Sequence, residues 1–438
     1  MDISIYFEPI QLKGYYYADK TRRKLIGDVV RAYIQPNDFP SYEKADLAII
    51  GMGEDRNCYF NSGCGLGPDA IRKELYRLFQ GNFKLNMVDL GNIISGHTIE
   101  DSYFALTTIL VELMENNIVP VILGGSQDLT FAQYRAYEKL GRIINIAAVD
   151  PQFDLGTSGD KLDSRSFMSH IILQQPNYLF NYTNIGYQTY FVDQQAINLM
   201  KNLYFDAYRL GVVRVNMEEV EPMVRNADMI SMDIGSVRAS DAPGNANASP
   251  NGFYGEEICQ IMRYAGLSDK LSSIGIYEVN PRLDRQAITA QLASQMIWYF
   301  IDGFYSRKGD FPPDKNKEMA KYTVTMKDFK DEVIFYRSNK SERWWMEVPI
   351  RSKNRIRYER HHLVPCSYQD YQTACQNYLP YMPCVSTANG HITARSRHPG
   401  GVMASFADGS VRFVPNNIAL TVWQTVSTMN DGVPMTLD

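Results

Sequence analysis

The sequence is poor in the residues that several classes of protein require. Its 438 residues include only six histidines and six cysteines, and the net charge is −5. No run of Lys and Arg is long enough to follow a phosphate backbone, so the composition predicts no nucleic-acid partner. No apolar stretch reaches the roughly 18 residues of a membrane span, so we expect no membrane insertion either.

Export and zinc signals are also missing. The first residues, MDISIYFEPI, lack the basic and then apolar pattern of a secretory signal. The cysteines form no CxxC pair, which is typical of reduced thiols in a cytoplasmic protein. His361, His362 and the cysteines at 366, 375 and 384 match the spacing of no closed zinc module. We therefore expect a cytoplasmic location and no structural zinc site.

From Asp46 to Phe304, short apolar runs alternate with amphipathic stretches. The runs predict buried strands with the sequences LAIIGM, VPVILGG, INIAAVD, MISMD and LSSIGIYEV. The stretches predict helices over Pro68–Phe79, Ser102–Asn116, Thr130–Leu140 and Gly255–Ala265. Strand and helix in turn predict an α/β fold of three layers, α/β/α, with a mainly parallel sheet. Ligands of such sheets bind beyond the carboxyl ends of the strands.

The composition changes twice after this region. VIFYRSNK, RWWMEVPI and RIRYERHHLVP read as short exposed strands, in which the pair Trp344–Trp345 is expected to be buried. Residues 381–438 contain no Lys and no Glu, and GGVMASFADGSVRFV predicts a hairpin that turns at Asp408–Gly409. We expect an α/β domain over 1–307, a β-rich extension over 308–380 and a separate tail over 381–438.

Polar side chains gather at the ends of the predicted strands. The segments GGSQDLT, AVDPQFDLG and SMDIGSV each end or follow a strand, and YEVNP follows a fourth. In AVDPQFDLG the polar residues stand at every second position, and an extended backbone puts such side chains on one side. We expect all of them to converge at one edge of the sheet. The candidate site residues are Gln127, Asp150, Gln152, Asp154, Asp233 and Glu278.

The order of these segments resembles the ureohydrolase family of arginases, agmatinases and formimidoylglutamases. There the motifs read roughly G-G-D-H, D-A-H-x-D and S-x-D-x-D, followed by E-V-N-P. GLGPDAIRKEL, VDLGNI and APGNANASPNGFYGEE resemble flanking segments of the family. The resemblance covers residues from about 46 to 307 and is nearest to the formimidoylglutamases. It implies an arginase-like fold and a trimer or hexamer of identical chains.

The resemblance also implies roles for single residues. In the family, two histidines and four aspartates hold two Mn²⁺ ions, whose shared hydroxide attacks an amidine or guanidinium carbon. Asp150, Asp154 and Asp233 match aspartates of that set, as candidate metal ligands and catalytic residues. Glu278 matches the residue that accepts the cationic nitrogen of the substrate, with pairing to an Arg such as Arg238 as the alternative. Asn245 lies in a loop that resembles the substrate loop.

Three positions depart from the family pattern. Gln127 and Gln152 stand where the family has histidines, and Gly235 stands where it has an aspartate. Because neutral amide oxygens hold transition metals weakly, we expect no tightly bound metal. Three interpretations stay open: relict carboxylates held by cationic side chains, backbone N–H groups or water; a single Mg²⁺ or Ca²⁺ on an all-oxygen site; and a working Mn²⁺ site with fewer ligands.

These departures favour a pseudoenzyme or binding scaffold whose partner is an unknown small molecule or protein. The alternative is an active hydrolase of C–N bonds in linear amidines, with formiminoglutamate, agmatine or arginine as types of substrate. From Ala394 the chain resembles the C-terminal segment of secreted bacterial pilin-like proteins. We interpret this combination as a fusion of unrelated pieces, with the junction near Tyr381.

Overall fold

The chain folds into two compact units, Met1–Pro312 and Pro313–Asp438, each described here in turn. The computed structural model describes residues 2–10, 24–156, 161–325, 332–341, 343–352 and 355–363, together with the strands Cys384–Val385, Ile392–Thr393, Gly401–Ser405 and Val411–Pro415.

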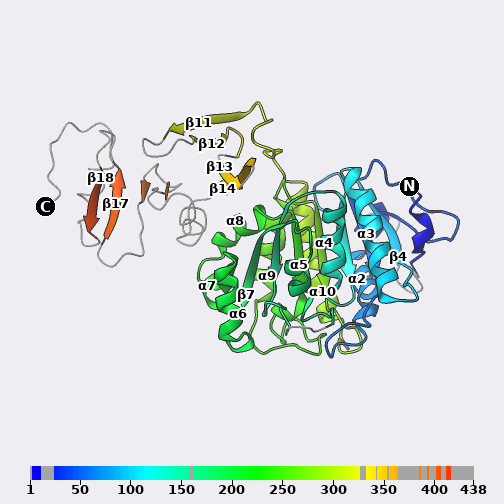
Figure 1. Cartoon of the computed structure of the whole chain (residues 1–438). Coiled ribbons are helices and arrows are strands. Elements are labelled where there is room, and N and C mark those ends of the chain that lie inside the picture. The colour runs from blue at the N-terminus through cyan, green and yellow to red at the C-terminus, as the bar shows by residue number, and fades with distance from the viewer. Residues whose placement is uncertain are drawn as a thin grey trace. The chain divides into compact units, whose positions relative to one another are not determined.

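The first unit is built on a ten-stranded sheet (Figure 1). Its strand order is β1-β4-β3-β5-β10-β9-β6-β7-β8, with β2 paired to β4. Among the described pairs only β1 and β4 are antiparallel. The strands are β1 (Phe7–Glu8), β2 (Arg31–Ala32), β3 (Leu47–Met52), β4 (Met87–Ile93), β5 (Val119–Gly124), β6 (Ile144–Val149), β7 (Leu179–Tyr187), β8 (Asp206–Arg209), β9 (Met229–Asp233) and β10 (Ser273–Tyr277).

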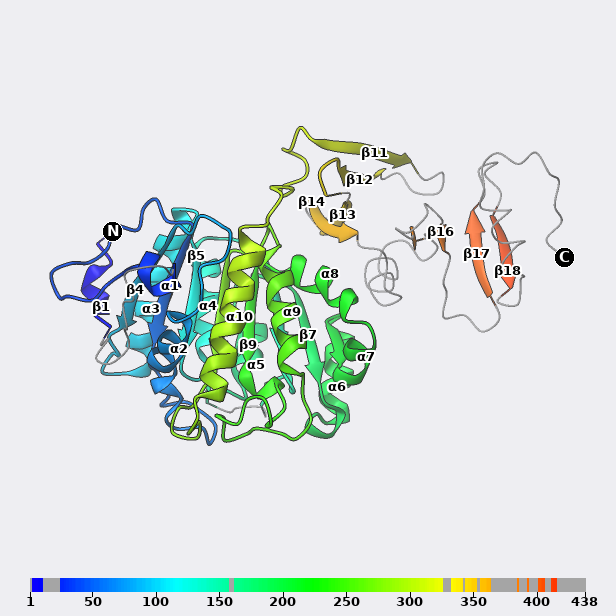
Figure 2. The same ribbon diagram turned by 180° about the vertical axis from the view of Figure 1, so that it is seen from behind.

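Helices cover both faces of this sheet. On the face seen in Figure 1 lie α3 (Ile99–Glu115), α4 (Leu129–Lys139) and α5 (Phe167–Leu173). On the face seen in Figure 2 lie α2 (Gly67–Leu75), α9 (Gly255–Gly266) and α10 (Ile288–Phe304). The other helices are α1 (Ile26–Val29), α6 (Gln194–Asn202), α7 (Leu210–Val215) and α8 (Val220–Arg225).

Each face of the sheet has its own apolar core. In β3, Leu47 and Ile49 pack with α2, α9 and α10, whereas Ala48 and Ile50 pack with α3 and α4. Successive side chains of a strand point to opposite faces, so a strand covered on both sides must be apolar throughout. This explains why the buried strands read as uninterrupted apolar runs, and it confirms the predicted three-layer α/β fold.

The predicted strands and helices are present, and the structure adds others. The sequence did not single out β7, β8 or α10 as elements. Polar residues interrupt β7, whose first three residues are only partly buried, and β8 is a four-residue strand at the end of the sheet. An apolar-run criterion misses such strands because they are not buried on both faces.

The second unit contains an antiparallel sheet of β11 (Met319–Thr325), β12 (Glu332–Ser338), β13 (Trp344–Ser352) and β14 (Arg355–Leu363). The expected burial of Trp345 is confirmed, whereas the expectation of exposed strands is wrong at Tyr336. The strands have seven to nine residues, and Tyr336 and Trp345 are buried. Aromatic side chains on one face of a sheet supply enough apolar area to be covered.

Two short antiparallel pairs follow, β15 (Cys384–Val385) with β16 (Ile392–Thr393) and β17 (Gly401–Ser405) with β18 (Val411–Pro415). The second pair has the strands of the predicted hairpin, with Ser405 opposite Val411. The expected turn at Asp408–Gly409 lies outside the described residues, as does the expected junction near Tyr381. The boundaries at 307 and 380 stay predictions.

Within the described part of the chain, no helix combines the length and the apolar character needed to cross a bilayer.

Candidate functional site

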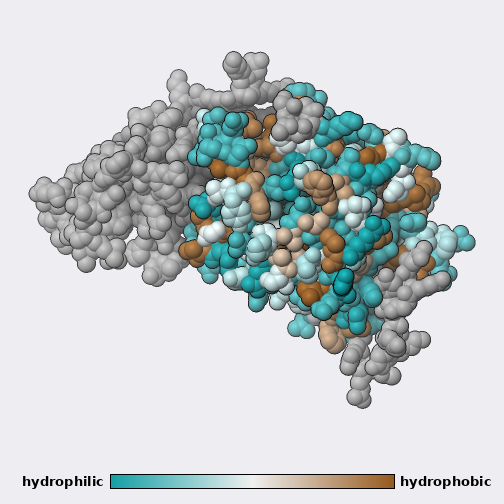
Figure 3. Space-filling model, turned by 90° about the horizontal axis from the view of Figure 1, so that it is seen from below, coloured by the Kyte–Doolittle hydropathy of each residue, from teal (hydrophilic) through white to brown (hydrophobic). Residues whose placement is uncertain are grey.

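The candidate residues meet at the carboxyl ends of four adjacent strands. Gln127 follows β5, Asp150 follows β6, Asp233 ends β9 and Glu278 follows β10. These strands are neighbours in the order β5-β10-β9-β6, so residues far apart in sequence reach one place. Figure 3 views this side of the molecule from below, and polar and apolar residues alternate there in small groups.

A cavity of about 330 Å³ opens above these strand ends. Two loops, around Ser164 and from Asn245 to Pro250, form the rest of its wall. Six of the lining residues carry the polar chemistry: Gln127, Gln152, Asp154, Arg165, Asp233 and Glu278. The structure therefore brings six of the seven predicted residues to one cavity, Asn245 included, and Gln127 connects them to the seventh, Asp150.

Asp150 is buried and fully engaged by protein donors. The Nε2 of Gln127 donates to its Oδ2 at 2.7 Å, and the backbone N–H of Gln152 donates to its Oδ1 at 2.7 Å. The same Gln127 amide lies 3.3 Å from the hydroxyl of Ser231. Gln127 thus directs an N–H donor, and not a lone pair, at the position where a metal ligand is expected.

Asp154 reaches the site through a turn and not through an extended strand. Its φ is +48°, in the left-handed region that only a few non-glycine residues adopt. The expectation of an extended segment from Asp150 to Asp154 was therefore wrong, although both carboxyls do converge. The two carboxyls lie close enough for the Asp150 charge to raise the pKa of Asp154. The Oδ2 of Asp154 is buried without a hydrogen-bond partner among the described residues.

Asp233 forms the third carboxylate, beside Gly235. The backbone N–H of Gly235 donates to Asp233 Oδ1 at 2.7 Å. A Cβ added at Gly235 would lie 2.8 Å from Asp233 Oδ2. A side chain at this position would displace only the end of the Asp233 side chain, and the glycine that stands here supplies no ligand of its own.

Glu278 is held by two donors and by a strained backbone. Its Oε1 accepts the backbone N–H of Gln127 at 2.9 Å, and its Oε2 accepts Nδ2 of Asn61 at 2.7 Å. Its φ is +69°. The suggested pairing with Arg238 was wrong, because Arg238 pairs with Asp241 at 2.9 Å. A non-glycine residue held at positive φ has to be fixed by its surroundings, and such residues cluster at binding sites.

Asn61 was missed by the sequence analysis and links three parts of the site. Besides Glu278, it accepts the N–H of Ala246 at 3.0 Å and the Nδ2 of Asn280 at 3.0 Å. The predicted Asn245 lines the cavity and donates to the backbone oxygen of Glu278 at 3.3 Å. No motif signals Asn61, since its role depends on contacts with residues more than 180 positions away.

Arg165 was also missed by the sequence analysis. It lies in the segment DSRSFMSH, from Asp163 to His170. Its guanidinium carbon lies 4.1 Å from the ring centroid of Tyr59, and its Nη2 donates to Asn247 at 3.2 Å. It lines the cavity without an ion pair to a described carboxylate. The cavity therefore has an acidic floor and one cationic side chain on its wall.

The pKa values of the carboxyls in the site are raised, because these groups are buried without a paired cationic side chain in the described part of the chain. Burial raises the pKa of the Asp150 carboxyl above its ordinary value. Burial and then the nearby Asp150 raise the pKa of Asp154 and of Asp233 well above the ordinary range. Burial also raises the pKa of Glu278 to about 8. A site that disfavours its own anions gains most from a cation that enters it.

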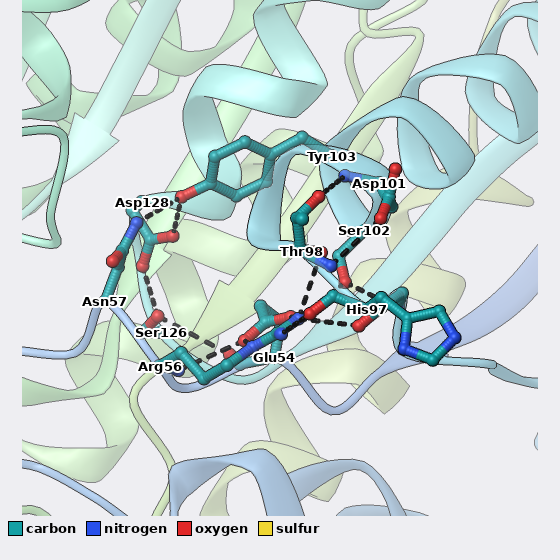
Figure 4. Close-up of polar contacts among 11 residues, drawn as sticks. Glu54, Arg56, Asn57, His97, Thr98, Asp101, Ser102, Tyr103, Ser126 and Asp128 are labelled. Carbon is teal, nitrogen blue, oxygen red and sulfur yellow. Dashed lines mark hydrogen bonds and ion pairs between the residues drawn. The ribbon is translucent and has the colours of Figure 1, made fainter.

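A polar framework next to the site fixes the turn that carries Gln127 (Figure 4). The carboxylate of Asp128 accepts the hydroxyls of Tyr103 and Ser126, and Asn57 donates to Tyr103 at 3.0 Å. Burial raises the pKa of Asp128 to about 6. A Cβ at Gly125 would lie 2.0 Å from a backbone oxygen, so only glycine allows this close approach.

The same framework anchors Arg56. Its Nε donates to Glu54 at 2.8 Å, and its Nη1 donates to the backbone oxygen of His97 at 2.8 Å. In Figure 4 the ring of His97 points away from Glu54 and Asp128, and His97 is not among the residues that line the cavity. His97 therefore contributes its backbone here and supplies no imidazole to the site.

The residues present do not fit a two-ion metal cluster. Amide N–H groups are aimed at Asp150, Gly235 supplies no side-chain ligand, and both imidazoles of the expected set are replaced. In the described ranges, no three His, Cys, Asp or Glu side chains are arranged to hold a metal ion. A hard cation on carboxylate and amide oxygens would need Gln127 to turn its oxygen inward.

Comparison with known proteins supports the fold. A family model described as the arginase family matches residues 45–302, and a model described as a protein of unknown function (DUF1559) matches residues 366–421. The formimidoylglutamase of Staphylococcus aureus is 26% identical over 268 residues, which is 58% of this chain and 85% of that protein. The formimidoylglutamase of Lysinibacillus sphaericus is 24% identical over 63% of this chain and 90% of its own length.

Solved structures give the same result. Trypanosoma cruzi formiminoglutamase, crystallised with Mn²⁺, has a TM-score of 0.57 at 22% identity and covers 61% of this chain and 97% of its own. Bacillus subtilis formimidoylglutamase has a TM-score of 0.61 at 19% identity and covers 68% of this chain and 97% of its own. Both likenesses show the arginase-like α/β fold.

Proposed function

Because the chain belongs to the arginase family, we propose that its cavity at the ends of β5, β6, β9 and β10 binds a small amidinium or guanidinium compound without metal-dependent hydrolysis. The observation that carries this proposal is the buried Asp154 Oδ2, an acceptor with no partner among the described residues, in a cavity floored by carboxyls. A buried acceptor without a partner is costly, and a ligand N–H group would remove that cost.

The cavity offers groups for both ends of a zwitterionic ligand. Asp154 and Asp233 can accept N–H groups from a planar cation, in charge-assisted hydrogen bonds. Arg165 on the wall can receive a carboxylate, which suits an amidine derived from an amino acid. The names of the relatives, formimidoylglutamases, support this class of ligand.

Hydrolysis is disfavoured by the residues that occupy the positions of the family's metal ligands. An amidine carbon needs a strong nucleophile, and the family supplies it as metal-bound hydroxide. Gln127 and Gly235 do not replace the ligands that would hold such metals. The carboxyls then serve to hold a cation, and because their pKa values are raised, a proton leaves one of them when that cation binds.

The competing function is an active hydrolase of linear amidines, and the relatives' names favour it. In that case Asp150, Asp154 and Asp233 hold Mn²⁺ or Mg²⁺ with help from Gln127 and Gln152, and Glu278 orients the substrate. Because the relatives' names favour the hydrolase, the absence of a tightly bound metal in this chain stays a prediction.

Calorimetric titration with formiminoglutamate, agmatine, arginine and free guanidinium tests the binding proposal. We expect saturable binding to the full chain, with release of about one proton, visible as a heat that changes with the ionisation enthalpy of the buffer. Asp154→Asn should weaken binding by about tenfold or more. Asp302→Asn, which changes a surface carboxylate paired with Arg263, should leave it unchanged. Equal affinity in wild type and Asp154→Asn would refute the proposed site.

Metal content and turnover decide between the two functions. The purified chain, incubated with Mn²⁺ and passed through a desalting column, should retain less than one ion per chain and release no ammonia, urea or formamide. Two retained ions together with turnover of any of the three substrates would establish the hydrolase instead.

The sequence analysis left both a small molecule and a protein open as the partner, and a protein partner stays a proposal. A homo-oligomer of three or six chains, a cytoplasmic location and the absence of nucleic-acid and membrane partners stay proposals. Sedimentation of the purified chain measures the first of these.

A further inference from the structure

A second cavity, of about 340 Å³, lies beside the first one. It is enclosed by the end of β7, the start of α7 and the loop that contains Asn251 and Gly252. Pro250 lines both cavities, so one loop separates them. Figures 1 and 2 place β7 and α7 at the end of the sheet that is remote from the N-terminal strands.

The charge of this second cavity is opposite to that of the first. Arg209, Arg214 and Arg238 line it, and none of its lining residues is acidic. The whole chain carries a net charge of −5, so a cluster of three guanidinium groups is a local exception. Arg209 has no ion pair within the described ranges. Neutral donors complete the wall, among them Thr189 and Asn251.

Two of the arginines are fixed in place before any ligand arrives. The guanidinium carbons of Arg214 and Arg238 each lie 3.9 Å from the ring centroid of Tyr254, so they are at most twice that distance apart. Arg214 Nε bonds Glu257 at 2.9 Å, and Arg238 Nε lies 2.9 Å from Asp241. Each carboxylate lies at the Nε side of its arginine.

This geometry matches a small oxyanion. Guanidinium groups give paired N–H donors in a plane, which suits the oxygens of phosphate and carboxylate. Groups held rigid by stacking and by ion pairs lose little entropy when an anion binds. A purely structural role for the Arg214–Tyr254–Arg238 stack would explain the two paired arginines, whereas Arg209 is an exposed side chain on the same wall and can turn toward a bound anion.

We propose that this cavity is a binding site for a multiply charged small oxyanion, a phosphate or a polycarboxylate, separate from the cation site. It rests on the three arginines and not on the proposed function of the first cavity. Pro250 belongs to both walls, so the two sites share one loop.

Calorimetric titration of the full chain with inorganic phosphate and with succinate, at constant ionic strength, tests this proposal. We expect saturable binding of at least one of the two anions. The double variant Arg209→Gln/Arg238→Gln should weaken binding by about tenfold or more. Arg263→Gln is the matched control, since Arg263 is also held at Nε by a carboxylate, at 2.8 Å from Asp302, but does not line the cavity.

Each outcome decides one question. Phosphate binding without succinate binding identifies a phosphate site, and the reverse identifies a carboxylate site. Binding that survives the double variant, or that Arg263→Gln weakens equally, would show nonspecific attraction and overturn the proposal, as would no binding of either anion. Asp154→Asn should leave anion binding intact, so failure of the cation site is recognised separately. A melting curve for every variant checks that it folds.

Discussion

Two groups of buried carboxylates in the same sheet differ in whether a cationic side chain pairs with them. Asp89 on β4 is completely buried and meets Arg72 at 2.8 Å and 3.0 Å, with Tyr76 donating at 2.8 Å. Asp150 and Asp154, after β6, meet amide donors and each other but no cation among the described residues.

The difference separates structure from function. A buried carboxylate with a matching guanidinium is complete and needs nothing from outside. Buried carboxyls that lack a paired cation among the described residues, one of which has an oxygen without a hydrogen-bond partner, can still bind a cation from outside. The first arrangement stabilises the fold, and the second prepares a site for a ligand. Four substitutions test this contrast, from the largest expected effect to the smallest.

Arg72→Met should destabilise the protein by about 3–5 kcal/mol, because it leaves Asp89 charged and buried without its partner. Chemical denaturation of both proteins measures the loss. The double variant Arg72→Met/Asp89→Leu should recover most of it, since removing both charges removes the uncompensated one. No recovery would mean that Arg72 acts by packing alone.

Glu278→Gln should change how stability depends on pH. The ordinary pKa of this side chain is 4.5, and in the folded protein it is about 8, so the folded state binds more protons across that interval. The free energy of unfolding of the wild type should therefore fall as pH rises from about 5 to about 8, with roughly 2–4 kcal/mol from this residue. Glu278→Gln should flatten that decline. An unchanged slope would contradict the raised pKa.

Asp154→Asn should stabilise the ligand-free protein by about 1 kcal/mol while it weakens cation binding. The substitution removes the repulsion with Asp150 and Asp233, and Asn adopts the φ of +48° readily. Thermal unfolding at pH 8, where repulsion is strongest, gives the clearest measurement. A loss of stability would instead show that Asp154, like Asp89, stabilises the fold.

Arg263→Ala should cost only about 0.2–1 kcal/mol, because both partners of its pair with Asp302 are partly exposed, at 41% and 28%. Denaturation in low and in high salt should show a smaller difference at high salt. A cost as large as that of Arg72→Met would show that burial does not explain the difference between the two ion pairs.

The sequence predicted the fold because its signal is carried by local patterns. Runs such as LAIIGM are apolar throughout, since each strand is covered on both faces, and the strand ends carry the polar motifs. Gln127, Asp150, Asp154, Asp233 and Glu278 could be identified in advance because parallel strands end at one edge. Short edge strands such as β8 have no such pattern and were missed.

Sequence alone thus determined the layers, the position of the site and the residues on its floor. Only the tertiary structure decided what these residues do to one another: that Gln127 gives a donor to Asp150, that Asn61 holds Glu278, and that Arg165 reaches the same cavity. It also separated the arginine cavity from the acidic one. Charges interact through space over a few ångströms, and chain positions far apart come that close only when the sheet has formed.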